Sequence, residues 1–295
     1  MTWTLMIGGT SVSLAVIVLM SMSVGILSGL FGVGGGFLLT PLLIFMGVDP
    51  AIAVATAAPQ IAASTITALI SHWRRGNVDV KLGLMLVSFS IPGTMLGVWA
   101  FTRLQAQDHL AVVLQLLFLL LLGGSGLTML VDGLRHHRRQ TVVLPHQLAG
   151  ENATHLWPAL PWPLRFTRSR IIVSALPLAG FAALVGFLGT LLGIGGGFVI
   201  VPVLITVFHV PVLVAAATSS FQIFFTMLMA SALHISQQHP IDPLLAFWLV
   251  VGGMIGGHIG SMVGGRLSAS AFRLWFALLM LAVAARFFYM IMQTG

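Results

Sequence analysis

The chain has 295 residues, of which 58% are hydrophobic and 6% charged, with a mean hydropathy of +1.06. Soluble domains carry about 25% charged residues, so this composition excludes a soluble globular domain and indicates a polytopic membrane protein. The net charge of +7 belongs to loops and helix ends, with no folded basic surface to bind nucleic acid. The absence of cysteine excludes disulfides and thiolate metal sites, and we expect no metal and no other cofactor.

The apolar runs predict an all-α membrane fold. A helix needs about 20 apolar residues to span a bilayer. Eight runs are long enough: 5–30, 51–72, 82–102, 110–131, 171–191, 212–234, 243–263 and 272–292. The first lacks a basic leading region and a cleavage site, so we expect a retained transmembrane segment. Two shorter runs, 37–47 and 198–208, reach only about 16 Å each as helices and predict half-helices.

One sequence block occurs twice. GVGGGF at 32–37 returns 161 positions later as GIGGGF at 193–198, and 7 of the 12 residues from Leu30 to Pro41 are identical in the two copies. The match continues beyond the glycines: Thr56, Gln60 and His72 correspond to Thr218, Gln222 and His234, and Gly93 and Gly97 to Gly256 and Gly260. We therefore predict two repeats of about five helical segments each, at 1–131 and 171–295, joined by a basic linker at 132–170.

The basic residues predict the orientation in the membrane. Cytoplasmic loops are enriched in Lys and Arg, which places the loop with Arg74, Arg75 and Lys81, and the basic linker, inside. The equivalent loop of the second half, 235–242, contains neither Lys nor Arg and is expected outside. Equivalent loops on opposite sides mean that the two repeats are inverted. We expect a multi-pass protein of the inner (plasma) membrane with both termini outside.

The glycine blocks are candidate binding elements. Three consecutive glycines break a helix, and open backbone at membrane depth is tolerated only where it is buried or lines a cavity. A helix that restarts there presents free N–H groups and a positive dipole end, which suit a small anion. The candidate residues are Gly34, Gly35, Gly36, Gly195, Gly196 and Gly197. Close helix packing is the alternative for these blocks, and it is the interpretation that we favour for the GxxxG pairs Gly93/Gly97 and Gly256/Gly260.

Polar residues on the helix after each block form the second candidate set. Thr56 and Gln60, like Thr218 and Gln222, are spaced i, i+4 and share a helix face. They could line a substrate site, with Ser219 beside them, or hydrogen-bond between helices. His258 is the histidine deep in an apolar run and is a candidate proton relay, with a proton or sodium as the candidate coupling ion.

A different class of function is an intramembrane serine protease. Ser125, within Gly123-Gly124-Ser125-Gly126, and His258 loosely resemble the rhomboid proteases. Catalysis would need Ser and His within hydrogen-bond reach. This interpretation leaves the duplication unexplained, so the sequence favours a protein that is not an enzyme.

With the duplicated Gly-x-Gly-Gly-Gly-Phe, the following Pro41 and Pro202, and the Thr/Gln helices, the chain resembles the sulfite exporter TauE/SafE family, also called toluene sulfonate uptake permeases. The resemblance extends over both halves. It implies transport of a small anion, such as the sulfur oxyanions and organosulfonates sulfite, thiosulfate and sulfoacetate. We expect a permease that works by alternating access, with a small anion and the lipid bilayer as partners. A permease for a carboxylate or another non-sulfur anion, or an anion channel, shares the same physical features.

Overall fold

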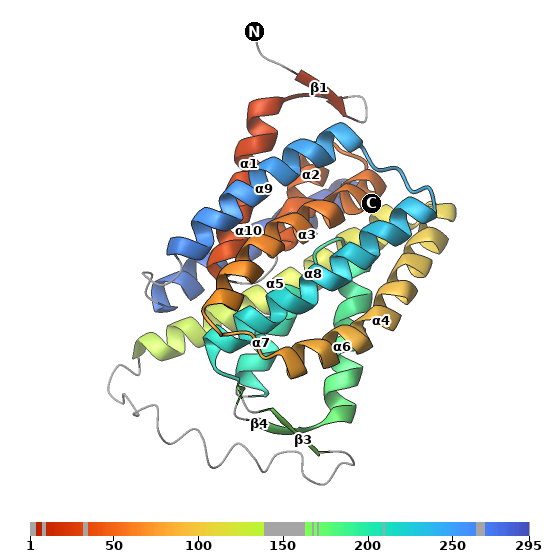
Figure 1. Cartoon of the computed structure of the whole chain (residues 1–295). Coiled ribbons are helices and arrows are strands. Elements are labelled where there is room, and N and C mark those ends of the chain that lie inside the picture. The colour runs from red at the N-terminus through yellow and green to blue at the C-terminus, as the bar shows by residue number, and fades with distance from the viewer. Residues whose placement is uncertain are drawn as a thin grey trace.

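The computed structural model describes residues 4–7, 10–31, 35–138, 163–166, 168–169, 171–208, 210–263 and 269–294. These residues form ten α-helices and two short β-hairpins (Figure 1). The helices are α1 (Leu14–Phe31), α2 (Gly36–Phe45), α3 (Pro50–Arg74), α4 (Val80–Ala106), α5 (Leu110–Arg138), α6 (Ala175–Leu191), α7 (Gly197–Thr206), α8 (Val212–Ser236), α9 (Pro243–Val263) and α10 (Ala269–Thr294). Five of them, α3, α4, α5, α8 and α9, are long and apolar enough to cross a membrane. The predicted all-α polytopic membrane class is confirmed, and the two half-helices occur where the sequence predicts them.

The two hairpins are a correction to the sequence analysis. The run 5–30 is not one helix, because β1 (Thr4–Ile7) pairs antiparallel with β2 (Thr10–Ser13) before α1 begins. In the second half, β3 (Pro163–Phe166) pairs with β4 (Ile171–Ser174) directly before α6. Counting apolar residues cannot separate a strand from a helix in such a run. The end of the predicted linker is thus a hairpin, and α5 continues past residue 131; residues 139–162 lie outside the described residues.

Helix packing follows the duplication. The first helix of each half packs on the fourth helix of the other, so that α1 lies on α9 and α6 on α4. The third helices α3 and α8 pack on each other, as do the last helices α5 and α10 (Figure 1). Exchanging the two halves leaves these pairings unchanged. The contacts therefore follow the internal repeat.

Glycines bring the backbones of these pairs together. A Cβ added at Gly93 of α4 would lie 2.0 Å from the carbonyl oxygen of Ala183 in α6. At Gly256 of α9 it would lie 2.1 Å from that of Met22 in α1. Real Cβ atoms do not approach so closely, so only glycine fits at either position. The GxxxG pairs serve packing, as the sequence analysis favours.

Two reciprocal hydrogen bonds fix the relative direction of α3 and α8. The backbone N–H of Asp242, which follows α8, donates to Thr56 Oγ1 near the start of α3 at 3.3 Å. The N–H of Asp79, which follows α3, donates to Thr218 Oγ1 near the start of α8 at 3.2 Å. Each helix thus begins where the other ends, and the two are antiparallel. The inverted orientation of the repeats in the membrane stays a prediction, and this antiparallel pair supports it.

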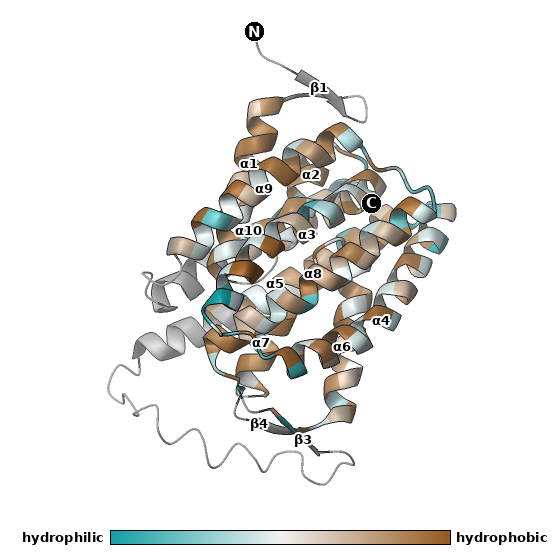
Figure 2. Cartoon of the chain, in the orientation of Figure 1, coloured by the Kyte–Doolittle hydropathy of each residue, from teal (hydrophilic) through white to brown (hydrophobic). Residues whose placement is uncertain are grey.

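The outward faces of the helices are apolar. Figure 2 shows hydrophobic residues along the helices and hydrophilic residues gathered in connections at their ends. Leu120 is 69% exposed and Met262 65% exposed. Such faces mark a surface that contacts another apolar phase, here the hydrocarbon of a bilayer.

A candidate substrate site between the halves

Both glycine blocks interrupt helical structure at a residue with a left-handed backbone conformation. Gly35, with φ 47°, precedes α2, and Gly196, with φ 72°, precedes α7. This region of φ is costly for residues that carry a Cβ. Neither helix start has a side-chain cap, and the first N–H groups of a helix have no carbonyl partner within it. Gly34 lies outside the described residues.

The two breaks meet beside the middle of α3 and α8. A Cβ at Gly36 would lie 2.2 Å from Ile61 Cδ1. A Cβ at Gly195 would lie 3.2 Å from Ile61 Cγ2 and 3.0 Å from Ile223 Cγ2. Ile61 and Ile223 both lie near the midpoints of their 25-residue helices. The blocks that are far apart in sequence therefore converge at the centre of the helix pair.

Contacts between the halves hold the breaks together. Thr40 Oγ1 of α2 donates to the carbonyl oxygen of Gly193 at 2.7 Å. The rings of Phe37 and Phe198, the second residues of the two half-helices, lie 6.2 Å apart between centroids. Both rings are almost completely buried. The break of each half is thus packed against that of the other.

Gln60 and Gln222 occupy this central level, because each directly precedes one of the two isoleucines. Both side chains are fully buried. Gln60 Nε2 donates to Ser21 Oγ at 3.4 Å, and Gln222 Nε2 donates to Ser90 Oγ at 3.1 Å. Neither Oε1 atom has a partner among the described residues. Both glutamines are predicted from the sequence as candidate site residues, and the structure places them in equivalent positions.

Three buried hydroxyl groups also lack a partner in the described part of the chain: those of Thr65, Thr94 and Thr190. They lie on α3, α4 and α6. Unpartnered buried polar atoms are few in native proteins and indicate a bound water, ion or ligand. The core around α3 and α8 therefore holds polar groups that its own side chains leave unpaired.

The structure does not bring Thr56 and Thr218 together. Their bonds to Asp242 and Asp79 place them at opposite ends of the α3–α8 pair. Ser219 Oγ donates back to the carbonyl oxygen of Ala216 in its own helix at 2.9 Å. The threonines join elements of the two halves, and a role for these three residues in substrate binding stays a prediction.

Sequence reasoning missed the next polar residue on each face. Ser64 follows Gln60 by four positions, and Thr226 follows Gln222 by four; both are buried. The duplication pairs them, since they are separated by the same 162 positions as the glutamines. That signal was present in the sequence. Ser21 and Ser90 carry no such signal, because their repeat counterparts are not serines.

His258 and Ser125 lie apart from this centre. His258 is on the exposed face of α9, whereas the neighbouring Gly257 faces Ser64 and Thr67 of α3. Its role as a proton relay stays a prediction. Ser125 Oγ donates within its own helix to the carbonyl oxygen of Leu121 and lies 3.8 Å from Met280 Sδ of α10.

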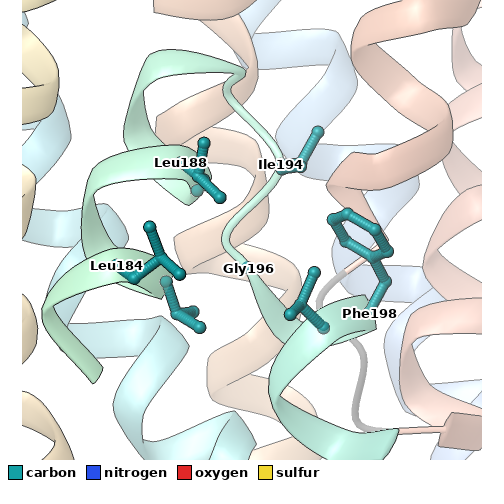
Figure 3. A pocket seen from close by; sticks show the side chains of 8 residues that line it. Leu184, Leu188, Ile194, Gly196 and Phe198 are labelled. Carbon is teal, nitrogen blue, oxygen red and sulfur yellow. The ribbon is translucent and has the colours of Figure 1, made fainter. Parts of the chain in front are cut away.

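A small apolar cavity adjoins the second break. Figure 3 shows Leu184 and Leu188 of α6 on one side of it, and Ile194 and Phe198 on the other. Its volume is about 20 Å³, which is room for roughly one water molecule. The two central glutamines have no exposed surface. The conformation described is closed around the centre, so a solute could reach the glutamines only after helices move.

The end of the α3–α8 pair beside Asp242 carries a histidine pair. The Nδ1 atoms of His234 and His239 are 2.7 Å apart, and His239 Nε2 is 3.1 Å from Thr102 Oγ1 of α4. Phe101 packs against both rings. His239 lies in the connection before α9, where burial lowers the pKa of its imidazole below the ordinary value.

Comparison with known proteins decides the family. The sequence profile of the family described as "Sulfite exporter TauE/SafE" matches residues 17–287. The chain belongs to this family. It is 25% identical over 285 residues to "Probable membrane transporter protein YunE" of Bacillus subtilis (strain 168), covering 94% of this chain and 98% of that protein. It is 31% identical over 265 residues to a "Probable membrane transporter protein" of Xylella fastidiosa (strain 9a5c), covering 88% and 89%.

A shorter match, 27% identical over 120 residues, relates this TauE/SafE chain to "Sulfite exporter TauE/SafE family protein 3" of Arabidopsis thaliana, covering 38% of this chain and 25% of that protein. No solved structure matches the chain. The matched range of the family includes both glycine breaks and both glutamines. The relatives are named as membrane transporters, so this TauE/SafE protein is a multi-pass transport protein and not a protease.

Proposed function

We propose that this TauE/SafE protein is a permease for a small anion, a sulfur oxyanion or organosulfonate of the sulfite, thiosulfate or sulfoacetate type, and that it works by alternating access. One observation carries the proposal. Two uncapped helix starts, after Gly35 and Gly196, belong to breaks that converge at Ile61 and Ile223, the residues next to the buried Gln60 and Gln222.

The charges of the site favour an anion. Helix N-termini present N–H groups and a positive dipole end, which attract negative charge. A site for a cation in a membrane normally carries a carboxylate. Of the acidic residues that the structure describes near α3 and α8, Asp49, Asp79 and Asp242 accept hydrogen bonds from the starts of helices. Around the central glutamines the described side chains are neutral amides, hydroxyls and hydrocarbons.

The sulfur chemistry of the substrate is supported by the family description and by the printed name of the Arabidopsis relative. The bacterial relatives are named only as transporters. A carboxylate or another non-sulfur anion would use the same dipoles and amides. The two substrate classes are therefore separated by experiment.

Alternating access is supported by the closed centre and by the antiparallel third helices. Gln60 and Gln222 are fully buried, so a solute can reach them only through an opening, which alternating access provides from one side of the membrane at a time. The Thr56–Asp242 and Thr218–Asp79 bonds lie at opposite ends of the helix pair. Opening one end while the other stays closed would expose the centre to one side only.

The test of substrate class uses purified protein. A ligand that binds only the folded state stabilises it by about 2.7 kcal/mol at a concentration of one hundred times its Kd. We expect sulfite, thiosulfate or a sulfonate to raise the melting temperature, and counterflow in proteoliposomes to show trans-stimulation. Stabilisation by short carboxylates alone would remove the sulfur assignment. Flux without trans-stimulation would indicate a channel.

The test of the site uses glycine variants. Gly35→Val and Gly196→Val place a branched side chain at a left-handed residue, where the added Cβ would lie 3.0 Å and 2.3 Å, respectively, from the nearest side-chain atom. We expect both variants to insert in the membrane and to lose transport. Thr128→Val, on the exposed face of α5, is the matched control and should transport normally. Normal transport by both glycine variants would contradict the proposed site.

We also propose the inner membrane as the location, with both termini outside. A reporter at each terminus that is protected from external protease would contradict this orientation. The basic loop that includes Arg74, Arg75 and Lys81 would then face outward, against the usual distribution of positive charge.

A further inference from the structure

The amide of Gln60 has one fixed end and one free end. Ser21 Oγ donates its proton to the carbonyl oxygen of Leu249 in α9. A serine hydroxyl has a single proton, so toward Gln60 this oxygen can act only as an acceptor. The group that faces it is therefore Nε2, and Oε1 points elsewhere. That Oε1 atom is buried and has no partner among the described residues.

The amide of Gln222 is fixed in the same way. Ser90 Oγ donates to the carbonyl oxygen of Ala182 at 3.0 Å and accepts from Gln222 Nε2 at 3.1 Å. Thr226 Oγ1 donates to its own helix and accepts the second Nε2 proton at 3.4 Å. Both protons of the amide are thus used inside the protein. What Gln222 leaves unpaired is again an acceptor, its Oε1 atom.

The two serines reach the glutamines from different helices. Ser21 lies on α1, where its repeat counterpart on α6 is Ala182. Ser90 lies on α4, where its counterpart on α9 is Gly253, and a Cβ at Gly253 would lie 2.3 Å from Gln60 Nε2. Each glutamine is therefore bonded to one serine of the adjacent helix pair. The serine lies on α1 in the α1–α9 pair and on α4 in the α4–α6 pair, and these are not equivalent helices of the repeat. The two halves reach the same amide orientation through different residues.

We propose that Ser21 and Ser90 are positioning residues that turn two amide oxygens toward the substrate, and that the preferred substrate is a monoanion with its own hydrogen-bond donor. Hydrogen sulfite or a hydroxyl-bearing sulfonate has that chemistry. This inference rests on the proposed anion transport. An anion that offers only acceptors leaves the oxygens of Gln60 and Gln222 unpaired, and a site with unpaired polar groups rejects such a ligand.

The first experiment compares ligands of equal charge that differ by one hydroxyl group. Purified protein is titrated with isethionate (2-hydroxyethanesulfonate) and ethanesulfonate, and with glycolate and acetate, and each apparent Kd is taken from thermal stabilisation. We expect the hydroxyl-bearing member of a pair to bind about tenfold tighter, the value of one hydrogen bond of about 1.4 kcal/mol. Equal affinity within both pairs would overturn the proposal.

The second experiment tests the serines. Ser21→Ala frees the amide of Gln60, and Ser90→Ala combined with Thr226→Val frees that of Gln222. The affinity ratio should then fall to about twofold or less while ethanesulfonate binds at least as well as before. A purely structural role would weaken both ligands alike. Ser231→Ala removes a buried hydroxyl of α8 that donates to the carbonyl oxygen of Met227 in its own helix, and it should keep the tenfold ratio. A full ratio in folded Ser21 and Ser90 variants would overturn the positioning role.

The outcomes separate this inference from the proposed function. A tenfold ratio in the glycolate pair, with no sulfonate bound, would remove the sulfur assignment and support the donor requirement. Binding of sulfonates without any ratio would leave the proposed function standing and overturn the donor requirement. Binding of none of the four ligands would overturn the donor requirement for organic anions, and sulfite and thiosulfate in the same assay would then decide the proposed function. If an alanine variant fails to fold, the wild-type ratio still decides the donor requirement.

Discussion

The two ends of the α3–α8 pair are closed by the same hydrogen bond but are supported differently. At one end Asp79 donates its N–H to Thr218, and its carboxylate accepts from Leu82 N and from both the N–H and the hydroxyl of Ser169, at 3.0 and 2.7 Å. Ser169 belongs to the turn between β3 and β4. The hairpin that precedes α6 thus holds this end of the pair.

At the other end Asp242 donates its N–H to Thr56, but among the described residues its carboxylate accepts only from Leu244 and Leu245 at the start of its own helix. The support here comes from His239, which contacts Thr102 of α4. Equivalent helices of the two repeats can thus be joined by equivalent hydrogen bonds, while the elements beside each bond determine how firmly that end is held. We infer that the Asp79 end is the more firmly closed.

The largest expected effect comes from removing the carboxylates. Asp79→Ala loses three accepted hydrogen bonds of a buried charged group, and we expect about 3 kcal/mol of stability to be lost. Asp242→Ala loses a helix cap and should cost about 1 kcal/mol. Thermal unfolding of the two purified variants measures the difference. Equal losses would mean that the hairpin does not strengthen the Asp79 end.

A smaller change isolates the hairpin. Ser169→Ala removes the hydroxyl that Asp79 accepts from and leaves the backbone N–H in place. We expect a loss of about 1.5 kcal/mol, and little further loss when Asp79→Ala is already present. A double-mutant cycle in thermal unfolding measures this coupling. Additive losses from the two substitutions would show that the serine acts elsewhere.

Much of this fold could be predicted from the sequence, because the deciding signals are local. Apolar length marks the spans, and the duplicated glycines mark the half-helices, since a left-handed residue such as Gly196 favours glycine. The glutamines were found because the duplication repeats them. The hairpin β1–β2 was missed, since strand and helix share an apolar composition over so few residues.

The parts of the site that were not predicted depend on contacts between the halves. The sequence does not distinguish Thr56 from Gln60 as a candidate site residue. In the structure, Thr56 bonds to a loop at the end of the helix pair, whereas Gln60 lies at its centre. Ser21 and Ser90 are ordinary serines of apolar helices until α9 and α6 are placed beside them. No spacing along one helix contains that information.

Removing a closing threonine should open one end of the pair only. Thr218→Ala and Thr56→Ala each lose one hydrogen bond, worth about 0.5–1.5 kcal/mol. The chain contains no cysteine, so single reporters at Val78→Cys and Ile241→Cys can be read without background. We expect Thr218→Ala to speed thiol labelling at position 78, and Thr56→Ala to speed it at position 241, by a few fold. Thr128→Ala, on α5, should change neither rate, and equal acceleration at both reporters would contradict separate closing bonds.

The smallest expected effect is a pH dependence at the Asp242 end. Burial lowers the pKa of His239, so the folded protein keeps this imidazole neutral where the unfolded chain would bind a proton. Its contribution to stability is complete above the ordinary pKa of about 6.5 and is lost as the pH falls from there through the lowered value. Acid should therefore speed labelling at position 241. In His239→Gln, whose side chain does not titrate, the acceleration at position 241 should be reduced, and an undiminished response in that variant would assign the proton to another group.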